Sequence, residues 1–321
     1  MLDPSRFHAG ANLPWIRYGC DFGANAWQPA GGLSARGVPD DVKQWLTRMG
    51  RANAGLVRWF LFTDGRAGIT FNGAEPTGID AHLFDDIEAA LALAAETGVT
   101  LMLTLFDFHW CHPARVVNEV QLGGRASTFA HADLRASLME TVLTPLLRAF
   151  GTRPEIAAWD VINEPEWVTG SVRSWHPWAA IRRHAMRQTI DDVRTLVRQF
   201  SPHPITVGLA SRRWLSFVEG LSLDFHQVHW YDRIDGDTPP DWPRPAPEGK
   251  PVMLGEFPTL HSRFTPEALL EMAERSGYFA ALPWSLLASD AATSGGEALC
   301  RVFEGYSGTN TGRATSSFLN P

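Results

Sequence analysis

The sequence predicts a single α/β domain, a (β/α)8 TIM barrel that spans residues 1–321. Three observations favour this fold. Short apolar runs alternate with amphipathic stretches, polar side chains gather where the apolar runs end, and a chain of 321 residues suits a barrel, which typically needs about 250 residues. Hydrophobic residues make up 45% of the chain and charged residues 20%, so the composition provides ample material for one core.

Seven apolar runs have the length and composition of strands in a parallel sheet that is covered on both faces. They are short, rich in β-branched or aromatic residues, and largely apolar on both faces. An eighth strand, the first in chain order, is expected within Phe7–Phe22. The seven runs are Leu56–Phe62, Val99–Asp107, Ile156–Asn163, Pro204–Leu209, Phe225–Tyr231, Pro251–Phe257 and Tyr278–Leu286.

The segments between these runs have helical periodicity. Apolar residues recur at helical spacing over Asp80–Gly98, and a long helix is expected from near Pro177 to Phe200. A capping threonine, a first-turn proline and an acidic residue open a further helix over Thr265–Gly277, which the glycine ends. The segment Leu134–Phe150 is also periodic, but Pro145 is expected to kink it.

Alternating strands and helices fit either a closed barrel or a doubly wound sheet. The chain has neither a G-x-G-x-x-G sequence after an early strand nor a P-loop, so the nucleotide-binding form of the open sheet lacks its fingerprint. In a barrel, functional residues gather at the carboxyl ends of several strands. The polar and aromatic residues at those ends are Arg58, Asp107, His109, Asn163, Glu164, His229, Tyr231, Glu256 and Trp284, and this pattern favours the barrel.

Charge and composition exclude several classes of protein. A formal net charge of −7 argues against nucleic acid or an anionic membrane as partner, because both need a basic face. The apolar stretches are too short to span a membrane, and the first residues do not resemble a secretory signal, so we expect a cytoplasmic protein, or a secreted one if the N-terminus was trimmed. The widely spaced Cys20, Cys111 and Cys300 are expected to be reduced thiols.

The chain contains 13 tryptophans, and a flat indole can stack on the apolar face of a sugar ring as well as fill a core. Trp59 and Trp159 lie in apolar runs and are expected in the core. The tryptophans that lie among glycine, proline and polar residues are expected on loops: Trp27, Trp110, Trp167, Trp175 and Trp242. Such loop positions are consistent with a sugar-binding cleft.

Two apolar strands end in a carboxylate. The run Trp159–Asn163 is followed by Glu164 and a proline that cannot continue a strand, and Val252–Gly255 is followed by Glu256. Retaining hydrolysis of a glycoside needs two carboxyl groups about 5–5.5 Å apart, one protonated and one ionised. Because strand ends converge at the mouth of a barrel, Glu164 and Glu256 are expected to form this pair.

These motifs resemble clan A of the glycoside hydrolases, most closely family 5, the cellulase and β-mannanase family. Asn163-Glu164-Pro165 follows a fourth strand and Gly255-Glu256-Phe257 a seventh, as in that family. The likeness extends over most of the chain. Further matches are the G-x-N-L sequence Gly10–Leu13, the arginine of Leu56–Arg58, the H-x-Y sequence His229–Tyr231, and Trp284 after the eighth strand.

The resemblance implies a role for each of these residues. Glu164 would be the acid/base, Glu256 the nucleophile, and Asn163 the partner of the sugar 2-hydroxyl, with Arg58 and Tyr231 beside the nucleophile. The remaining substrate contacts are expected from His109, His229, Trp284, Trp27 and Trp110. The chain departs from the family in its third strand, which ends Leu105–His109, and in its long first βα loop.

Chemistry adds constraints of its own. The charge of Arg58 inside an apolar strand needs an anionic partner, and Glu256 would supply one. His229 and Tyr231 are two residues apart and share one face of their strand. The negative charge of Glu256 is expected to raise the pKa of Glu164, and Glu166, which follows the proline, is expected on a loop.

The sequence therefore favours a retaining hydrolase that acts without a cofactor or metal on a β-linked glucan, mannan or related oligosaccharide. Two alternatives remain open: a non-catalytic barrel that binds carbohydrate, and a metal-dependent hydrolase centred on His109, Cys111 and His112. No second cluster at zinc spacing supports the metal reading, and the chain lacks the G-x-S-x-G sequence of serine hydrolases. The sugar, the linkage, the choice between internal and terminal cleavage, and the choice between hydrolysis and transglycosylation stay open.

Overall fold

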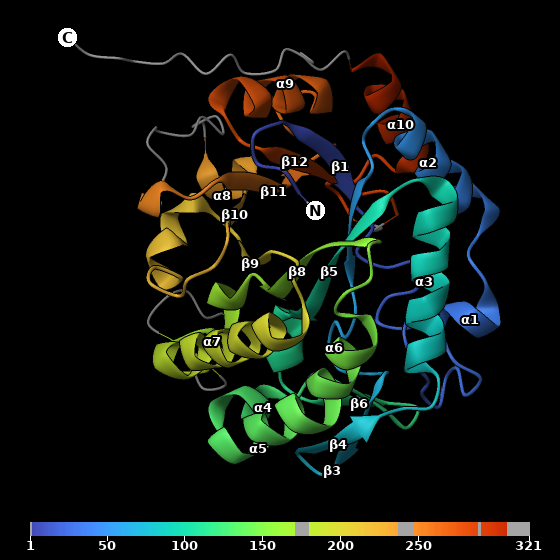
Figure 1. Cartoon of the computed structure of the whole chain (residues 1–321), viewed down its shortest axis with the longest axis vertical. Coiled ribbons are helices and arrows are strands. Elements are labelled where there is room, and N and C mark those ends of the chain that lie inside the picture. The colour runs from blue at the N-terminus through green and yellow to red at the C-terminus, as the bar shows by residue number, and fades with distance from the viewer. Residues whose placement is uncertain (1, 171–179, 237–246, 288–289, 307–321) are drawn as a thin grey trace.

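The computed structural model describes residues 2–170, 180–236, 247–287 and 290–306. Within these residues, eight parallel strands close into a barrel whose neighbours follow chain order, which confirms the predicted fold (Figure 1). Each of the seven predicted runs matches one strand to within two residues at either end, and the eighth strand comes from the start of Phe7–Phe22. The barrel strands are β1 (His8–Asn12), β2 (Leu56–Phe60), β5 (Thr100–Asp107), β8 (Ile156–Asn163), β9 (Ile205–Leu209), β10 (His226–His229), β11 (Val252–Pro258) and β12 (Ala280–Trp284).

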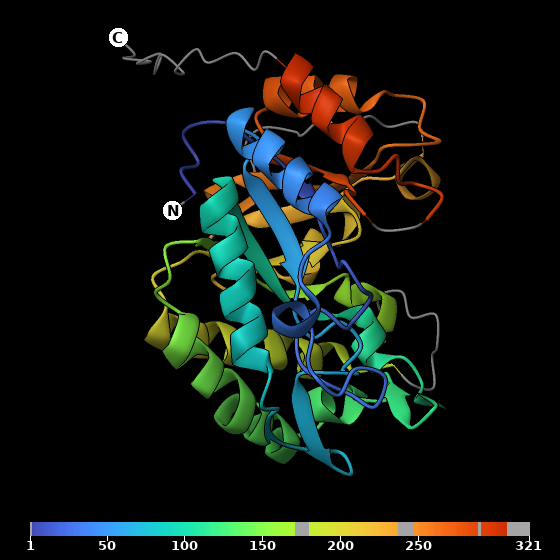
Figure 2. The same ribbon diagram turned by 90° about the vertical axis from the view of Figure 1, so that its right-hand side faces the viewer.

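Helices surround the barrel, as Figures 1 and 2 show from two directions. No helix in the described part of the chain has the length and apolar character that a membrane span requires. The α-helices are α1 (Leu33–Arg36), α2 (Asp40–Arg51), α3 (Leu83–Thr97), α4 (Ala126–Ala130), α5 (Ala132–Ser137), α6 (Thr144–Phe150), α7 (Arg183–Phe200), α8 (Asp232–Asp235), α9 (Pro266–Ser276) and α10 (Gly296–Gly305).

The expected helix boundaries have clear physical causes. The Asp80 carboxylate accepts hydrogen bonds from the backbone N–H groups of His82 and Leu83 at the start of α3, and Gly98 ends this helix with a φ of 74°. The Thr265 hydroxyl accepts from the Ala268 N–H at 3.3 Å and caps α9. The described part of α7 begins at Arg183, whereas the expected start near Pro177 lies outside the described residues.

The segment with the predicted kink is irregular. A π-helical stretch, Leu138–Leu143, joins α5 to α6, and Pro145 lies in the first turn of α6. A proline in that position cannot donate a hydrogen bond to the preceding turn, so the wider π spacing falls where the regular α-helical pattern cannot continue.

Short elements follow the carboxyl ends of the barrel strands and build the mouth. Two antiparallel hairpins follow barrel strands: β3 (Ile69–Asn72) pairs with β4 (Glu75–Ile79) after β2, and β6 (Arg115–Val117) pairs with β7 (Val120–Leu122) after β5. The remaining elements are the 3-10 turns Phe108–Cys111, Pro165–Val168, Arg212–Phe217 and Pro247–Gly249.

The barrel interior changes from apolar to polar along its axis. Side chains near the amino ends of the strands form an apolar plug that includes Leu56, Met102 and Met253. Above this plug the interior becomes polar: Arg58, Thr104 and Asp160 are fully buried, and Arg58 and Thr104 both donate to Asp160. The apolar plug closes one end of the barrel, so access to the polar layer is from the carboxyl end, where functional residues of barrels lie.

Candidate active site

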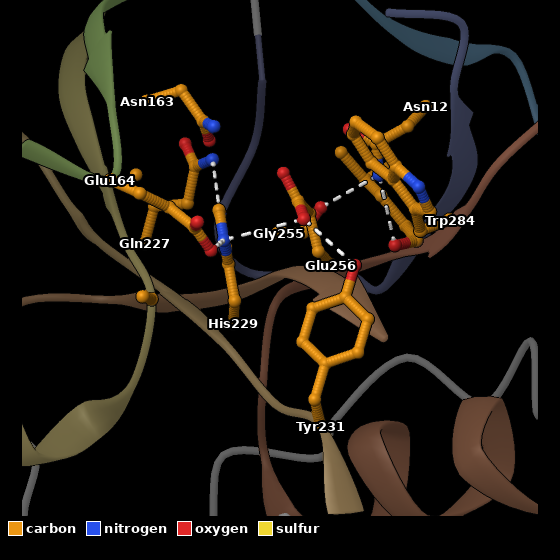
Figure 3. Close-up of polar contacts among 12 residues, drawn as sticks. Asn12, Asn163, Glu164, Gln227, His229, Tyr231, Gly255, Glu256 and Trp284 are labelled. Atoms are coloured by element: carbon orange, nitrogen blue, oxygen red, sulfur yellow. Dashed lines mark hydrogen bonds and ion pairs between the residues drawn. The ribbon is translucent and has the colours of Figure 1, made fainter. Parts of the chain in front are cut away.

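Glu164 and Glu256 converge at the mouth of the barrel. Glu164 follows the last residue of β8, Glu256 lies in β11, and the pairing of β10 with β11 sets His229 opposite Glu256. Figure 3 shows His229 between the two carboxylates. Ligand atoms of Glu164, His229 and Glu256 all lie within 4.8 Å of one another. This short separation matches the retaining arrangement and is well below the roughly 6.5–9.5 Å of inverting enzymes.

Glu256 is held by a cation and a hydroxyl, as its sequence context predicts. Arg58 Nη1 lies 2.6 Å from Glu256 Oε1, and the Tyr231 hydroxyl donates to Oε2 at 2.9 Å. Burial, and to a smaller extent the neighbouring Glu164, raise the pKa of Glu256, while His229, Arg58 and the Tyr231 hydrogen bond oppose this rise. The direct ion pair with Arg58 therefore favours the carboxylate form at this position.

A buried network fixes Arg58. Its Nε and Nη2 donate to Asp160 at 2.9 and 2.7 Å, and Nη2 also donates to Asn163 Oδ1 at 2.8 Å. The expectation of an anionic partner for Arg58 is met twice, by Glu256 and by Asp160, which we did not predict. The pairing of β8 with β9 is irregular between Asp160 and Asn163. The two residues are three apart, so strict alternation would direct them to opposite faces.

Glu164 has a different environment. Trp167 Nε1 donates to its Oε2 at 2.6 Å, and His229 Nδ1 lies 2.8 Å from Oε1. Burial is the main cause that raises the pKa of Glu164 to about 7; the Trp167 hydrogen bond and Arg58 lower it, and Asp107 raises it. We expected the charge of Glu256 to cause this rise, but removal of the Glu164 carboxyl from water is its largest cause.

The backbone of Glu164 is unusual. Its φ of 47° and ψ of 51° place it in the left-handed region, which is uncommon for residues other than glycine. Such conformations persist where the surroundings hold them, and they cluster at functional sites. Pro165 follows directly and opens the turn that carries Trp167 back to the Glu164 carboxylate.

His229 is uncharged at neutral pH. Burial first of all lowers its pKa to about 4, despite the raising effect of Glu256. Gln227 Nε2 lies 3.5 Å from His229 Nε2, and an amide nitrogen can only donate, so in this arrangement the ring proton is on Nδ1. His229 then donates to Glu164 at 2.8 Å and lies 3.5 Å from Glu256, as Figure 3 shows.

The side chains of Asn163 and His109 both contact the Asp107 carboxylate. Asn163 Nδ2 donates to Asp107 Oδ2 at 2.8 Å, and His109 Nδ1 pairs with Asp107 Oδ1. Burial lowers the pKa of His109, but the Asp107 carboxylate outweighs it and raises the pKa overall. The His109 side chain is 39% exposed, so it can reach a ligand in the cleft. We did not predict the role of Asp107 in holding both side chains.

Three of the five tryptophans expected on loops lie within the described residues. Trp27 is 40% exposed, as expected. The expectation of a substrate contact for Trp110 is wrong: it is fully buried, stacks on Phe129, and donates from Nε1 to the Thr128 hydroxyl. Trp167 is also buried, but it contacts Glu164. Trp175 and Trp242 lie outside the described residues.

Trp284, which the sequence predicts as a substrate contact, lies beside Glu256 (Figure 3). It clusters with Phe60 and Tyr231, and its Nε1 donates to Asp290 at 2.6 Å. Asn12, labelled in Figure 3, donates to the Gly255 carbonyl at 2.9 Å and joins β1 to the strand that carries Glu256. The aromatic ring and this cross-barrel bond hold one wall of the site in place.

Glu166 lies in the 3-10 turn Pro165–Val168 after β8, in agreement with the expected loop, but its side chain is fully buried. It accepts from the Ala210 N–H at 2.6 Å, and burial raises its pKa well above the usual value.

The metal hypothesis for His109, Cys111 and His112 loses support. Within the described ranges, the histidine, cysteine and acidic side chains that converge at ligand distance are Glu164, His229 and Glu256, and Cys111 is buried.

The chain as a whole is similar in sequence to known proteins. No protein-family model matches the chain. A mannan endo-1,4-beta-mannosidase from Cryptopygus antarcticus is 23% identical over 87% of this chain and 80% of that protein. One from Mytilus edulis is 24% identical over 87% of this chain and 83% of that protein.

Solved structures extend the likeness to the fold. The endo-1,4-beta-mannanase from Eisenia fetida matches with a TM-score of 0.75 at 18% identity, and the match covers 93% of this chain and 90% of that protein's chain. The beta-1,4-D-mannanase from Cryptopygus antarcticus has a TM-score of 0.72 at 21% identity, with 93% and 89% covered. Sequence and fold together confirm the predicted resemblance of this chain to clan A glycoside hydrolases, and among them to the β-mannanases.

Proposed function

We propose that this protein hydrolyses internal β-1,4 linkages of mannan with retention of configuration, and that residues 1–321 form one catalytic domain. The observation that carries the proposal is the close pair Glu164 and Glu256, whose surroundings favour different protonation states. The choice of mannan follows the relatives, which are named mannan endo-1,4-beta-mannosidases and are similar over most of the chain.

In the first step, Glu256 attacks the anomeric carbon while Glu164 gives its proton to the leaving oxygen. The C–O bond of the linkage breaks, and a covalent bond to Glu256 forms. A pKa of about 7 for Glu164 keeps a large fraction protonated at neutral pH. Arg58 and Tyr231 hold Glu256 as the carboxylate that attacks.

In the second step, Glu164 is the base. It takes a proton from water, the hydroxide oxygen attacks the anomeric carbon, and the bond to Glu256 breaks. Two inversions restore the original β configuration. The cycle consumes one water per bond cleaved, and each carboxyl group returns to its starting state.

The neighbouring residues bind and orient the sugar. Both polar ends of the Asn163 amide are engaged, by Arg58 and by Asp107, which leaves one N–H free to bind the 2-hydroxyl. The remaining sugar contacts are assigned to His109, which is partly exposed, and Trp284, whose ring lies beside Tyr231. His229 donates to Glu164 and also lines the site.

The stereochemistry and the substrate can be tested together. The purified protein is incubated with β-mannan, β-glucan and xylan, and fresh products are followed by proton NMR before mutarotation. We expect mannan to be cleaved fastest, with the β-anomer appearing first. Initial release of the α-anomer would refute retention, and a binding protein without catalysis would release no product. Equal activity after treatment with a chelator distinguishes the proposed mechanism from the metal-dependent alternative.

A further inference from the structure

An exposed tryptophan is held rigidly at the rim of the barrel mouth. Trp27 lies between β1 and α1, in the long first βα loop, and is 40% exposed. Its indole Nε1 donates to the Asn118 carbonyl at 3.2 Å, in the turn between β6 and β7. Its backbone N–H donates to Asn25 Oδ1 at 2.9 Å. Two loops that follow different strands therefore fix the orientation of this ring.

The guanidinium of Arg66, from the segment after β2, contacts the Trp27 ring. It lies 5.6 Å from the centroid of the Trp27 ring and 4.4 Å from that of Tyr18. Two hydrogen bonds to Asp64, at 2.9 and 2.7 Å, hold the guanidinium in one orientation. Both partners are largely buried. The cation is thus fixed before any ligand arrives, and so is the indole that it contacts.

Aromatic rings and the Arg66 side chain connect Trp27 to the reacting centre. Trp284 lies 6.0 Å from Trp15, and Trp15 lies 4.5 Å from Tyr18, all as ring centroids. Tyr18 also meets the His109 ring edge-on at 6.2 Å. Trp284, Trp15 and Tyr18 therefore form a row of ring contacts, and the Arg66 guanidinium joins the last of these rings to Trp27.

We propose that Trp27 is an outer sugar-binding platform, which stacks on a mannose unit several positions away from the bond that is cleaved. The inference rests on the proposed function and extends it. An indole that remains exposed yet is fixed by three loops is prepared for a flat apolar ligand, because no side-chain freedom is lost on binding. The apolar face of a pyranose has this shape, and an extended β-1,4 chain places further pyranoses along the cleft.

The inference predicts a dependence on substrate length. The Trp27→Ala variant is compared with the wild type on β-1,4-manno-oligosaccharides of two to eight units and on an aryl β-mannobioside. We expect kcat/KM to fall about three- to tenfold on the longest oligosaccharides, the size of an aromatic stacking contact, and to change less than about twofold on the short substrates. Trp27→Phe keeps an aromatic face and is expected to restore part of the loss.

Leu260→Ala provides the matched control, because Leu260 is exposed to a similar extent, 42%, but follows β11. It should not alter the dependence on length, and thermal unfolding should show that all variants are folded. Equal losses by Trp27→Ala at every length, or no loss at any, would overturn the platform. A wild type that cleaves neither short nor long mannosides would instead refute the proposed function, and the platform would fall with it.

Discussion

Replacing Trp167 by phenylalanine tests how the site sets the protonation of Glu164. The indole N–H lies 2.6 Å from Glu164 Oε2 and stabilises the carboxylate, so it lowers a pKa that burial raises to about 7. A hydrogen bond to a charged group contributes about 1.5–3 kcal/mol, and one pKa unit corresponds to about 1.36 kcal/mol. The Glu164 side chain is 12% exposed, so water can replace part of this bond, and we expect a shift of about one unit.

The proposed role of Glu164 as the acid determines the direction of the shift. The first step needs the protonated acid, so kcat/KM falls as pH rises through the pKa of Glu164. Removing the donor raises this pKa and should move the alkaline limb of the profile upward by about one pH unit. The assay is the pH dependence of kcat/KM on a soluble manno-oligosaccharide.

Trp214→Phe is the control for this measurement. Trp214 packs edge-on against Trp167 at 5.5 Å, so the substitution perturbs the same packing and leaves the hydrogen bond to Glu164 in place. An alkaline limb that stays unchanged in Trp167→Phe, or that moves to lower pH, would refute the assignment of Glu164 as the acid. A similar shift in both variants would attribute the effect to packing.

Three further predictions test the remaining parts of the site. Glu256→Gln should lower kcat by a factor on the order of 10⁴ or more, and thermal unfolding should show a folded protein, since Asp160 still pairs with Arg58. A 2-deoxy-2-fluoro mannoside should label Glu256 in the wild type; a label on another residue would contradict its role. Glu164→Ala should retain more activity on a dinitrophenyl mannoside, whose leaving group needs no proton, than on mannan, and added azide should give the β-azide; an α-azide would exclude the acid/base assignment. Arg58→Met leaves Asp160 and Glu256 buried without their cation and should lower the free energy of unfolding by about 3–5 kcal/mol. The control Arg48→Met removes only solvent-accessible ion pairs and should lower this free energy by about 0–1 kcal/mol. Equal losses of the two variants in urea denaturation would argue against a buried network.

The sequence alone determined the barrel and its central pair. Each strand is a local apolar run, and a carboxylate directly after such a run must lie at the barrel mouth, so Glu164 and Glu256 could be found without knowledge of distant contacts. Arg58 was predictable for the same reason, because a charge inside an apolar strand requires a partner nearby.

Partners and burial depended on contacts between distant segments. Trp110 follows a strand and lies between histidine and cysteine, which suggests an exposed loop, yet a 3-10 turn returns its ring to the core beside Phe129. Trp167 has a similarly polar context and lies against Glu164, because the left-handed backbone of Glu164 reverses the chain.

The environment of each carboxyl group was decided by the tertiary structure. Which carboxylate receives the Arg58 cation depends on how β2, β8 and β11 are aligned around the barrel, and burial, which is the main cause of the raised pKa of Glu164, is set by every element packed around it. The support of Trp27 likewise joins loops that follow β1, β2 and β5. A local sequence pattern shows which side chain follows a strand and at which end of the strand it lies. Hydrogen bonds and burial depend on residues that are far apart in the sequence and close in space, so they could not be read from the pattern.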